Sequence, residues 1–311
     1  MKKSNSGRIQ RDLNGIIVIN KPGLLTSNAV LQHVKRLFEA RKAGHMGSLD
    51  PLATGMLPIC FGEATKFSHY GLNADKGYEV TALFGVETDT GDAQGQVTAT
   101  ASIDQLTREQ IEHQMAAFLG DYLQIPPMYS ALKHQGKKLY ELARAGIEVA
   151  REARPIKIYD FQLDSFTPPF ARFKVRCSKG TYIRTLITDL GERLNVGAHV
   201  TQLHRHYTAG FEDQPMYTWE ALALLSNEER DRCLLPADFI VRQLPALLLS
   251  SEQVQALYQG KIVQMEGDAS SGEVRLYDGD QQFQGLGEWN QTTRELKAKR
   301  LMRAKMTIFP D

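Results

Sequence analysis

The spacing of apolar residues predicts both strands and helices along the first 243 residues. Residues 15–19 form a short apolar run that ends near a Pro-Gly turn, which is typical of a buried strand. Residues 77–84 and 172–177 alternate between apolar and polar side chains, so each predicts a strand with one face in the core, and Tyr78 lies on the core face of the first. Helical spacing predicts helices over 29–40, capped by Ser27 or Asn28, over 111–119, and up to 194 after a bend at Gly180.

From about residue 244 the elements become shorter. Ser250 or Ser251 is positioned to cap a short helix that ends at Gly260, where a left-handed backbone is expected. Strand-like runs follow at 272–277, 283–288 and 296–308, and glycine-containing turns lie between them. This pattern predicts a small β-barrel domain over 244–311 whose last strand is basic.

Residues 44–55 read as a shaped loop between a helix and an apolar strand at 57–61. Three glycines permit tight bends, and Pro51 biases the residue before it away from the helical region. The loop carries His45, Ser48 and Asp50, and loops of this kind often hold functional groups. An equally good interpretation of the loop alone is a turn in which Asp50 only accepts bonds from nearby backbone N–H groups. A short helix is expected over 63–70, with Gly71 ending it.

Charge is unevenly distributed although the 311 residues have a net charge of only +1. Residues 1–43 contain nine Lys or Arg against two acidic residues, whereas residues 71–124 contain two against nine. Such blocks suggest a polarised surface that favours a polyanion on one side, although solvated faces would also explain them. Bases and aromatic residues interleave over 124–140, and Arg172, Lys174 and Arg176 share the solvent face of their strand, which would suit contacts with RNA phosphates and bases.

Several classes of protein are disfavoured. Cys60, Cys177 and Cys233 are far apart, which argues against a disulfide framework and a cysteine-rich zinc site. No apolar run is long enough for a membrane span, and no signal peptide follows the basic residues 1–10, so we expect a cytoplasmic protein.

Common catalytic motifs are also missing. His45, Ser48 and Asp50 are too close in one loop for a serine triad, and neither G-x-S-x-G nor a phosphate-binding loop occurs. Asp89 and Asp92 lack further ligands at a convincing spacing, so no metal site is predicted. One carboxylate on a rigid loop remains, with aromatic and cationic residues on other elements, and this combination suits chemistry on an extruded nucleobase.

The motif GHMGSLDPLATG at 44–55, continued to Lys66, closely resembles the signature of the TruB family of tRNA pseudouridine synthases. Other segments match the family in order along the chain: NG at 14–15, KP at 21–22, KGY at 76–78, TDTGD at 88–92, YSALK at 129–133, CSKGTYIR at 177–184 and GAHV at 197–200. The tail resembles the family's PUA-like domain. Asn20, Met46 and Ser48 depart from the usual pattern, but none of them replaces the carboxylate of Asp50.

The resemblance implies a fold and an activity. The expected fold is α/β (α+β), with a mixed, largely antiparallel central sheet flanked by helices over 1–243, an RNA-contacting insertion around 124–155, and a PUA-like β-barrel over 244–311. The implied activity is that of an isomerase, which flips uridine 55 out of the T loop of tRNA and converts it to pseudouridine without metal or cofactor. The partner would be the T stem-loop, and the chain is expected to act as a monomer.

The resemblance also implies residue roles. Asp50 matches the catalytic aspartate, Arg184 its ion-pair partner, and Tyr78 the ring that stacks on the flipped base and is a candidate for removing the C5 proton. Tyr182 and Leu203 match residues that line the same pocket, and His45 matches the imidazole that fills the gap left by the nucleotide. Lys66, Lys133 and Arg205 match RNA-binding residues that contact phosphate or the RNA loop, and Asp92 is expected to be structural. The alternatives are a non-catalytic RNA-binding or RNA-folding module and, with less support, a hydrolase that uses Ser48.

Overall fold

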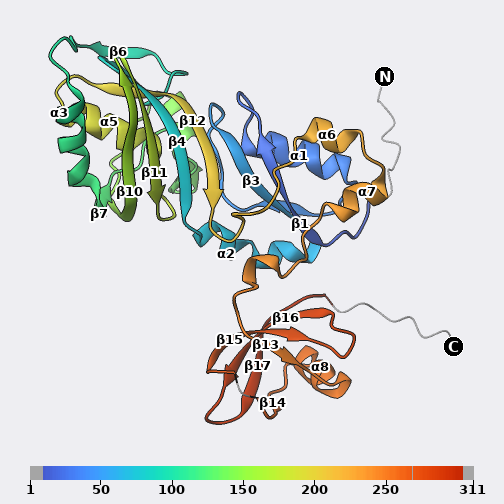
Figure 1. The fold of residues 1–311 in the computed structure, drawn as a ribbon. Coiled ribbons are helices and arrows are strands. Elements are labelled where there is room, and N and C mark those ends of the chain that lie inside the picture. Colours follow the sequence, from blue (N-terminus) through green and yellow to red (C-terminus); the bar gives the residue numbers. More distant parts are fainter. Residues whose placement is uncertain (1–9, 268, 304–311) are drawn as a thin grey trace.

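One mixed sheet of eight strands forms the body of the protein (Figure 1). The structure is a computed structural model that describes residues 10–267 and 269–303. The strands lie in the order β1 (Gly15–Lys21), β3 (Thr54–Phe61), β12 (Ala198–Thr208), β4 (Lys76–Phe84), β11 (Phe170–Cys177), β10 (Arg154–Thr167) and β7 (Gly120–Gln124), with β2 (Ala43–His45) also on β3. All neighbours are antiparallel except β12 and β3. The expected mixed, largely antiparallel sheet is therefore confirmed.

β3 and β12 pair at only two positions, and this short junction positions the loop of residues 46–53, called the glycine-rich loop below. β3 pairs along its length with β1, while its other edge pairs with β2 at Ile59–Phe61 and with β12 at Thr54 and Gly55. Residues 46–53 connect β2 to β3 at the point where β12 joins. The expected loop over 44–55 is thus shorter than predicted, because both of its ends are strand residues.

Two groups of helices pack against the sheet (Figure 1). α1 (Ser27–Leu37) packs its apolar residues against β1 and β3, and α3 (Arg108–Met115), the 3-10 turn Ala116–Phe118 and α5 (Ile183–Arg193) pack with β4, β10 and β11. Along β4, Tyr78, Val80, Ala82 and Phe84 are all buried, as the alternation predicts. The N-cap of α1 is Thr26, whose hydroxyl accepts a bond from the Ala29 N–H, and the predicted caps Ser27 and Asn28 lie inside the helix.

The segment after β3 differs from its prediction. Gly62–Phe67 is a 3-10 helix, and it leads directly into α2 (Ser68–Asn73), which contains Gly71 and does not end there. A Cβ atom at Gly71 would lie 2.6 Å from the sulfur of Met46, so this glycine serves close packing. The helix therefore lies against the first residue of the loop.

The remaining elements of the body are short. β5 (Val86–Thr88) pairs with β6 (Val97–Thr100), and the insertion around 124–155 contains the hairpin β8 (Lys133–His134) and β9 (Lys137–Lys138) followed by α4 (Leu139–Arg144). α6 (Trp219–Ala223), α7 (Asn227–Arg232) and the 3-10 turn Phe239–Val241 lead to the second sheet.

A smaller curled sheet of five strands follows (Figure 1). Its order is β13 (Ala246–Leu248), β15 (Gly272–Tyr277), β16 (Phe283–Asn290), β17 (Glu295–Leu301) and β14 (Val263–Gln264), and α8 (Ser251–Tyr258) packs with it. Ser250 caps α8, and Gly260 has a φ of 75°, so both predictions are confirmed. The last strand was expected to reach residue 308; it ends at Leu301, and residues 304–308 lie outside the described residues.

The second sheet docks on the segment 62–73 of the body. The rings of Phe67 and Phe283 meet edge to face with centroids 5.3 Å apart, and Tyr70 donates a hydrogen bond to Glu273. Lys66 donates from Nζ to the carbonyl of Leu301 at 2.9 Å. The same segment thus contacts both the glycine-rich loop and the C-terminal sheet.

Candidate active site

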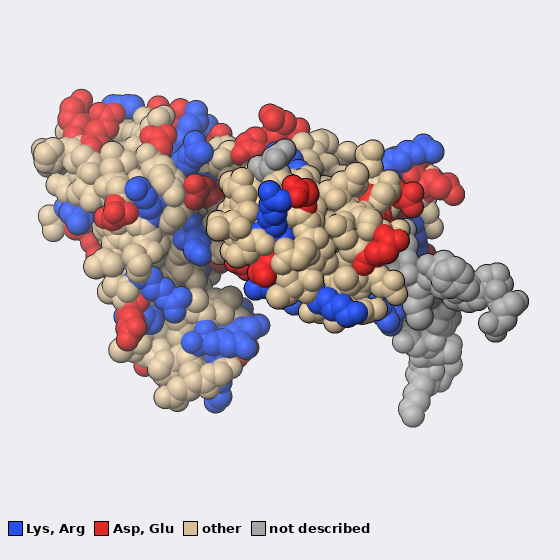
Figure 2. Space-filling view, turned by 90° about the horizontal axis from the view of Figure 1, so that it is seen from below, with Lys and Arg blue, Asp and Glu red and all other residues tan. Residues whose placement is uncertain are grey.

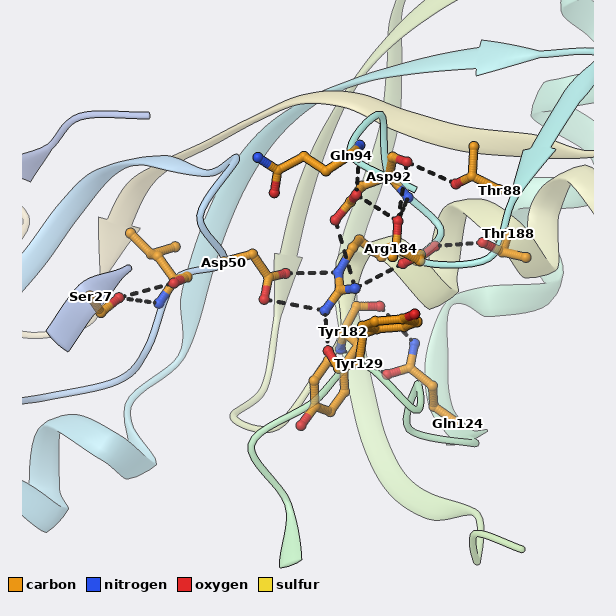
Figure 3. A network of polar contacts seen from close by, with 12 residues as sticks. Ser27, Asp50, Thr88, Asp92, Gln94, Gln124, Tyr129, Tyr182, Arg184 and Thr188 are labelled. Atoms are coloured by element: carbon orange, nitrogen blue, oxygen red, sulfur yellow. Dashed lines mark hydrogen bonds and ion pairs between the residues drawn. The ribbon is translucent and has the colours of Figure 1, made fainter. Parts of the chain in front are cut away.

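Asp50 and Arg184 form a bidentate ion pair (Figure 3). Arg184 donates from Nε to Oδ2 of Asp50 at 2.8 Å and from Nη2 to Oδ1 at 3.2 Å. The side chain of Arg184 is 4% exposed, whereas that of Asp50 is 35% exposed. Because parallel charge-assisted bonds fix both position and plane, Arg184 holds the partly exposed carboxylate in one orientation.

Arg184 is itself fixed by two other segments (Figure 3). Its Nη1 donates to the carbonyl of Thr90 and its Nη2 to that of Tyr129, both at 2.8 Å. Asp92 lies behind it, with Oδ2 3.7 Å from Nη1, and accepts further bonds from the Thr90 hydroxyl and the Gln94 N–H. The loop after β5 and the insertion therefore join at the guanidinium, which fits a structural role for Asp92.

The loop is anchored from its other side by buried polar groups. Ser27 both donates to the carbonyl and accepts from the N–H of Leu49, next to the catalytic candidate. Lys21 is completely buried and donates to the carbonyls of Pro51 at 3.2 Å and Ala53 at 2.6 Å. Burial lowers the pKa of the Lys21 amine to about 8. These bonds explain how a glycine-containing loop holds one conformation.

Arg205 reaches the loop from β12. Its side chain is buried, and it donates to the carbonyls of Met56 at 2.8 Å, Gly47 at 3.3 Å and Ser48 at 3.5 Å. Arg205 thus anchors the protein's own loop, while the RNA contact expected for it stays a prediction. At 1% exposure the guanidinium does not present itself to a phosphate at the surface.

Aromatic and apolar side chains complete the site. Tyr78 on β4 and Leu203 on β12 are buried in one cluster with Leu49 and Ala53 of the loop. Tyr182, the N-cap residue of α5, lies beside Arg184 and exchanges two hydrogen bonds between its backbone and the side chain of Gln124 (Figure 3). Burial raises the pKa of both phenols. The structure thus brings Asp50, Arg184, Tyr78, Tyr182 and Leu203 together from four segments: the loop, the start of α5, β4 and β12.

Comparisons with known proteins agree along the chain. Residues 35–183 match the model of the TruB family pseudouridylate synthase N-terminal domain, 184–242 that of the tRNA pseudouridylate synthase B C-terminal domain, and 245–302 that of the C-terminal domain of pseudouridine synthase II TruB. A curated relative from Pasteurella multocida (strain Pm70), named tRNA pseudouridine synthase B, is 50% identical over 281 residues, which cover 89% of this chain and 91% of the relative. The chain belongs to the TruB family of pseudouridylate synthases.

Other relatives and solved structures extend this comparison. The tRNA pseudouridine synthase B of Haemophilus influenzae (strain ATCC 51907 / DSM 11121 / KW20 / Rd) is 51% identical over 281 residues, covering 89% of this chain and 90% of the relative. A chain of an archaeal box H/ACA sRNP Nop10–Cbf5 complex superposes with a TM-score of 0.67 at 22% identity, covering 93% of this chain and 86% of its own. The structural likeness shows that the fold is shared.

The other predicted residues of this TruB-family chain lie around the site. His45 ends β2, and its Nδ1 is buried without a hydrogen-bond partner among the described residues. Burial, assisted by Arg205, lowers the pKa of its imidazole, which favours the neutral ring. Lys66 is engaged by Glu63 and the C-terminal sheet, while Lys133 is exposed in the hairpin of the insertion.

Figure 2 shows the molecule from below, and on this face Lys and Arg gather in several separate groups, with Asp and Glu between them.

Within residues 10–267 and 269–303, no group of three or more His, Cys, Asp or Glu is arranged to hold a metal ion. None of the described helices combines the length and apolar character needed to cross a membrane.

Sequence reasoning missed the groups that hold the TruB-family loop in place. The Thr90 and Tyr129 carbonyls that bind Arg184 are backbone atoms, which leave no residue-specific mark in a sequence. Lys21 and Lys76 were noted only as parts of matching motifs, yet both amines are buried. The position of Lys21 directly at the end of an apolar strand was a sequence signal that could have indicated its burial.

The buried Lys21 predicts a dependence of stability on pH. Its pKa is about 8 in the folded protein and higher in the unfolded chain, so between these values the unfolded state binds more protons and stability rises with pH. Urea unfolding of Lys21→Met should therefore show a larger loss relative to wild type at about pH 9.5 than at about pH 7. The exposed Lys137→Met is the control, and a loss for Lys21→Met that is equal at both pH values would contradict the prediction.

Proposed function

We propose that this chain is a tRNA pseudouridine synthase that isomerises uridine 55 of the T loop, with Asp50 as the catalytic residue acting on an everted nucleotide. The observation that carries the proposal is the bidentate pair of Asp50 and Arg184 beside Tyr78, Tyr182 and Leu203. The names of the curated relatives support tRNA as the substrate. The position within tRNA rests on the resemblance of the motifs to the family.

The reaction explains why one carboxylate is sufficient. Isomerisation breaks the N1–C1′ bond, turns the uracil and forms a C5–C1′ bond, while one proton leaves C5 and one is gained at N1. Asp50 can act on the sugar or the base as nucleophile or as base, and its fixed orientation shortens the search for the reactive geometry. Arg184 contributes this orientation because four of its bonds hold the guanidinium in place.

The apolar walls suit an everted base. A uracil ring leaves the stack at the cost of unstacking, and stacking on an aromatic side chain offsets part of that cost. Tyr78 and Tyr182 supply aromatic rings and Leu203 an apolar wall beside the carboxylate. In this proposal His45 fills the gap that the everted nucleotide leaves in the RNA.

A hairpin with the sequence of the T arm tests the function. Purified protein should convert the uridine at the position of residue 55 to pseudouridine without added metal or cofactor, and chemical derivatisation followed by mass spectrometry would detect it. A hairpin with that uridine replaced by cytidine is the control. Binding of the hairpin without any conversion would instead support the non-catalytic RNA-binding module.

RNA affinity should fall with salt. Each phosphate neutralised by a Lys or Arg releases counterions, so the logarithm of the binding constant should fall linearly with that of the salt concentration between about 0.05 and 0.3 M. If the exposed Lys133 contacts a phosphate, Lys133→Ala should lower the slope by about 0.7 to 0.9. Fluorescence anisotropy with a labelled hairpin measures this slope, and a response independent of salt would exclude a phosphate-dominated interface.

A further inference from the structure

Tyr78 has two buried cations at neighbouring positions of the sheet. Arg205 is its direct neighbour across the β4–β12 pair, and Lys76 precedes it by two residues on the same face of β4. Arg205 is 1% exposed and Lys76 is 6% exposed. A Cβ atom at Gly47 would lie 3.6 Å from Nη1 of Arg205 and 3.9 Å from Cε of Lys76, so both side chains converge beneath one residue of the loop.

Neither of these two cations forms an ion pair with a carboxylate of the residues that the structure describes. In the described ranges, Arg205 donates only to the carbonyls of Met56, Gly47 and Ser48, and Lys76 only to carbonyls at the end of α2 and to that of Ala74. Arg184, in contrast, has two carboxylates beside it. A buried charge without a counter-charge is costly, and neutral donors could hold the same carbonyls. The positive charge therefore calls for an explanation beyond loop anchoring.

The Tyr78 phenol is a buried group that can become an anion, and it is paired with Arg205 across β4 and β12. Three charged or titratable groups face it: Arg205 from β12, Cys177 from β11 and Asp50 from the loop. Burial raises the pKa of the Cys177 thiol, so this group stays neutral, and Asp50 opposes negative charge on the phenol. Burial also raises the pKa of Tyr78, and Arg205 acts against that effect. Arg205 is thus the group placed to stabilise a phenolate here.

We propose that Arg205, backed by Lys76, stabilises the anionic form of Tyr78 during turnover and so makes this tyrosine a proton carrier between two atoms of the uracil. The inference rests on the proposed function and extends it. Arg205 acts through Tyr78 and is a positioning residue, since it does not itself need to touch the base.

The proton and electron balance closes within the site. When the N1–C1′ bond breaks, its electron pair stays on N1, and the phenol gives its proton to N1 and becomes phenolate. The C5=C6 electron pair then forms the C5–C1′ bond. The phenolate removes the proton from C5, the C–H electrons restore the C5=C6 bond, and Tyr78 is a phenol again. One proton has moved from C5 to N1, and no other reactant is consumed.

Titration of a fluorotyrosine placed at position 78 tests the electrostatic step directly. In the 19F spectrum of the full chain, Arg205→Gln should raise the pKa of this phenol by about one unit or more, while Arg205→Lys should keep most of the wild-type value. Lys21→Met is the matched control, because this buried lysine anchors the same loop through Pro51 and Ala53. It should leave the titration of residue 78 nearly unchanged.

Kinetics test the consequence. With a T-arm hairpin, Arg205→Gln should slow single-turnover conversion by about 10- to 100-fold, and deuterium at C5 of the target uridine should slow it further. Lys76→Met should also raise the pKa of the phenol and slow the conversion. This variant replaces Arg205→Gln in both measurements if Arg205→Gln does not fold. An unchanged phenol titration in both variants would overturn the inference, since loop anchoring alone would then explain the cations. Failure of the wild type to convert the hairpin would refute the proposed function, while the titration would still report on Arg205.

Discussion

Asp50→Asn is expected to form no measurable pseudouridine from a T-arm hairpin that the wild-type protein converts completely, and to bind that hairpin within a few-fold of wild type. The amide keeps the size of the carboxylate but loses its negative charge and nucleophilic oxygen, so chemistry fails while the shape of the pocket remains. The loop has independent anchors at Ser27, Lys21 and Arg205, and these should preserve its conformation. Mass spectrometry of the product and anisotropy of a labelled hairpin measure the two expectations.

A matched variant separates the role of Asp50 from a general loss of negative charge. Asp89 is an exposed carboxylate on the neighbouring turn, where it accepts a bond from the Gln96 N–H. Asp89→Asn should retain nearly the full rate, because this carboxylate does not pair with Arg184. Complete conversion by Asp50→Asn would refute its catalytic role, whatever the behaviour of the control.

Local patterns predicted the elements that carry the site. The alternation in β4 places Tyr78 on the buried face, and that in β11 leaves Arg172, Lys174 and Arg176 exposed, as the structure confirms. Such patterns are reliable here because a strand between a core and solvent must alternate with period two. They say nothing about which strands are neighbours, so the pairing of Tyr78 with Arg205 could not be read from them.

The predictions that were wrong concern contacts between distant segments. Ser27 was expected to cap α1, but its hydroxyl is used by Leu49, and Thr26 takes the cap. Gly71 was expected to stop a helix, but the helix continues because the glycine makes room for Met46. In each case the residue type suits a local role, and a partner from the glycine-rich loop decides the actual one. Tertiary contacts of this kind override local preference.

The family resemblance reached further than pattern reasoning, although it could not give mechanism. It related Asp50 and Arg184, which are 134 residues apart in the sequence, and it added Tyr78 to the same site; the structure does bring these residues together. It assigned Arg205 only as an RNA contact, which stays a prediction. The burial of this arginine could not be foreseen, because the basic alternation around it does not indicate which of its residues lie in the core.

Tyr78→Leu is expected to bind the T-arm hairpin but to convert it at least about 100-fold more slowly than wild type. Leucine fills part of the same buried space, so the pocket wall survives, while the stacking ring and the phenol proton are both lost. Phe84→Leu is the control, because Phe84 lies on the same buried face of β4 and should lower stability by about 1 kcal/mol with little change in rate. The two variants are compared by their single-turnover rates, measured at a temperature below the thermal unfolding transition of both. A wild-type rate for Tyr78→Leu would mean that Tyr78 serves the core alone, as Phe84 does.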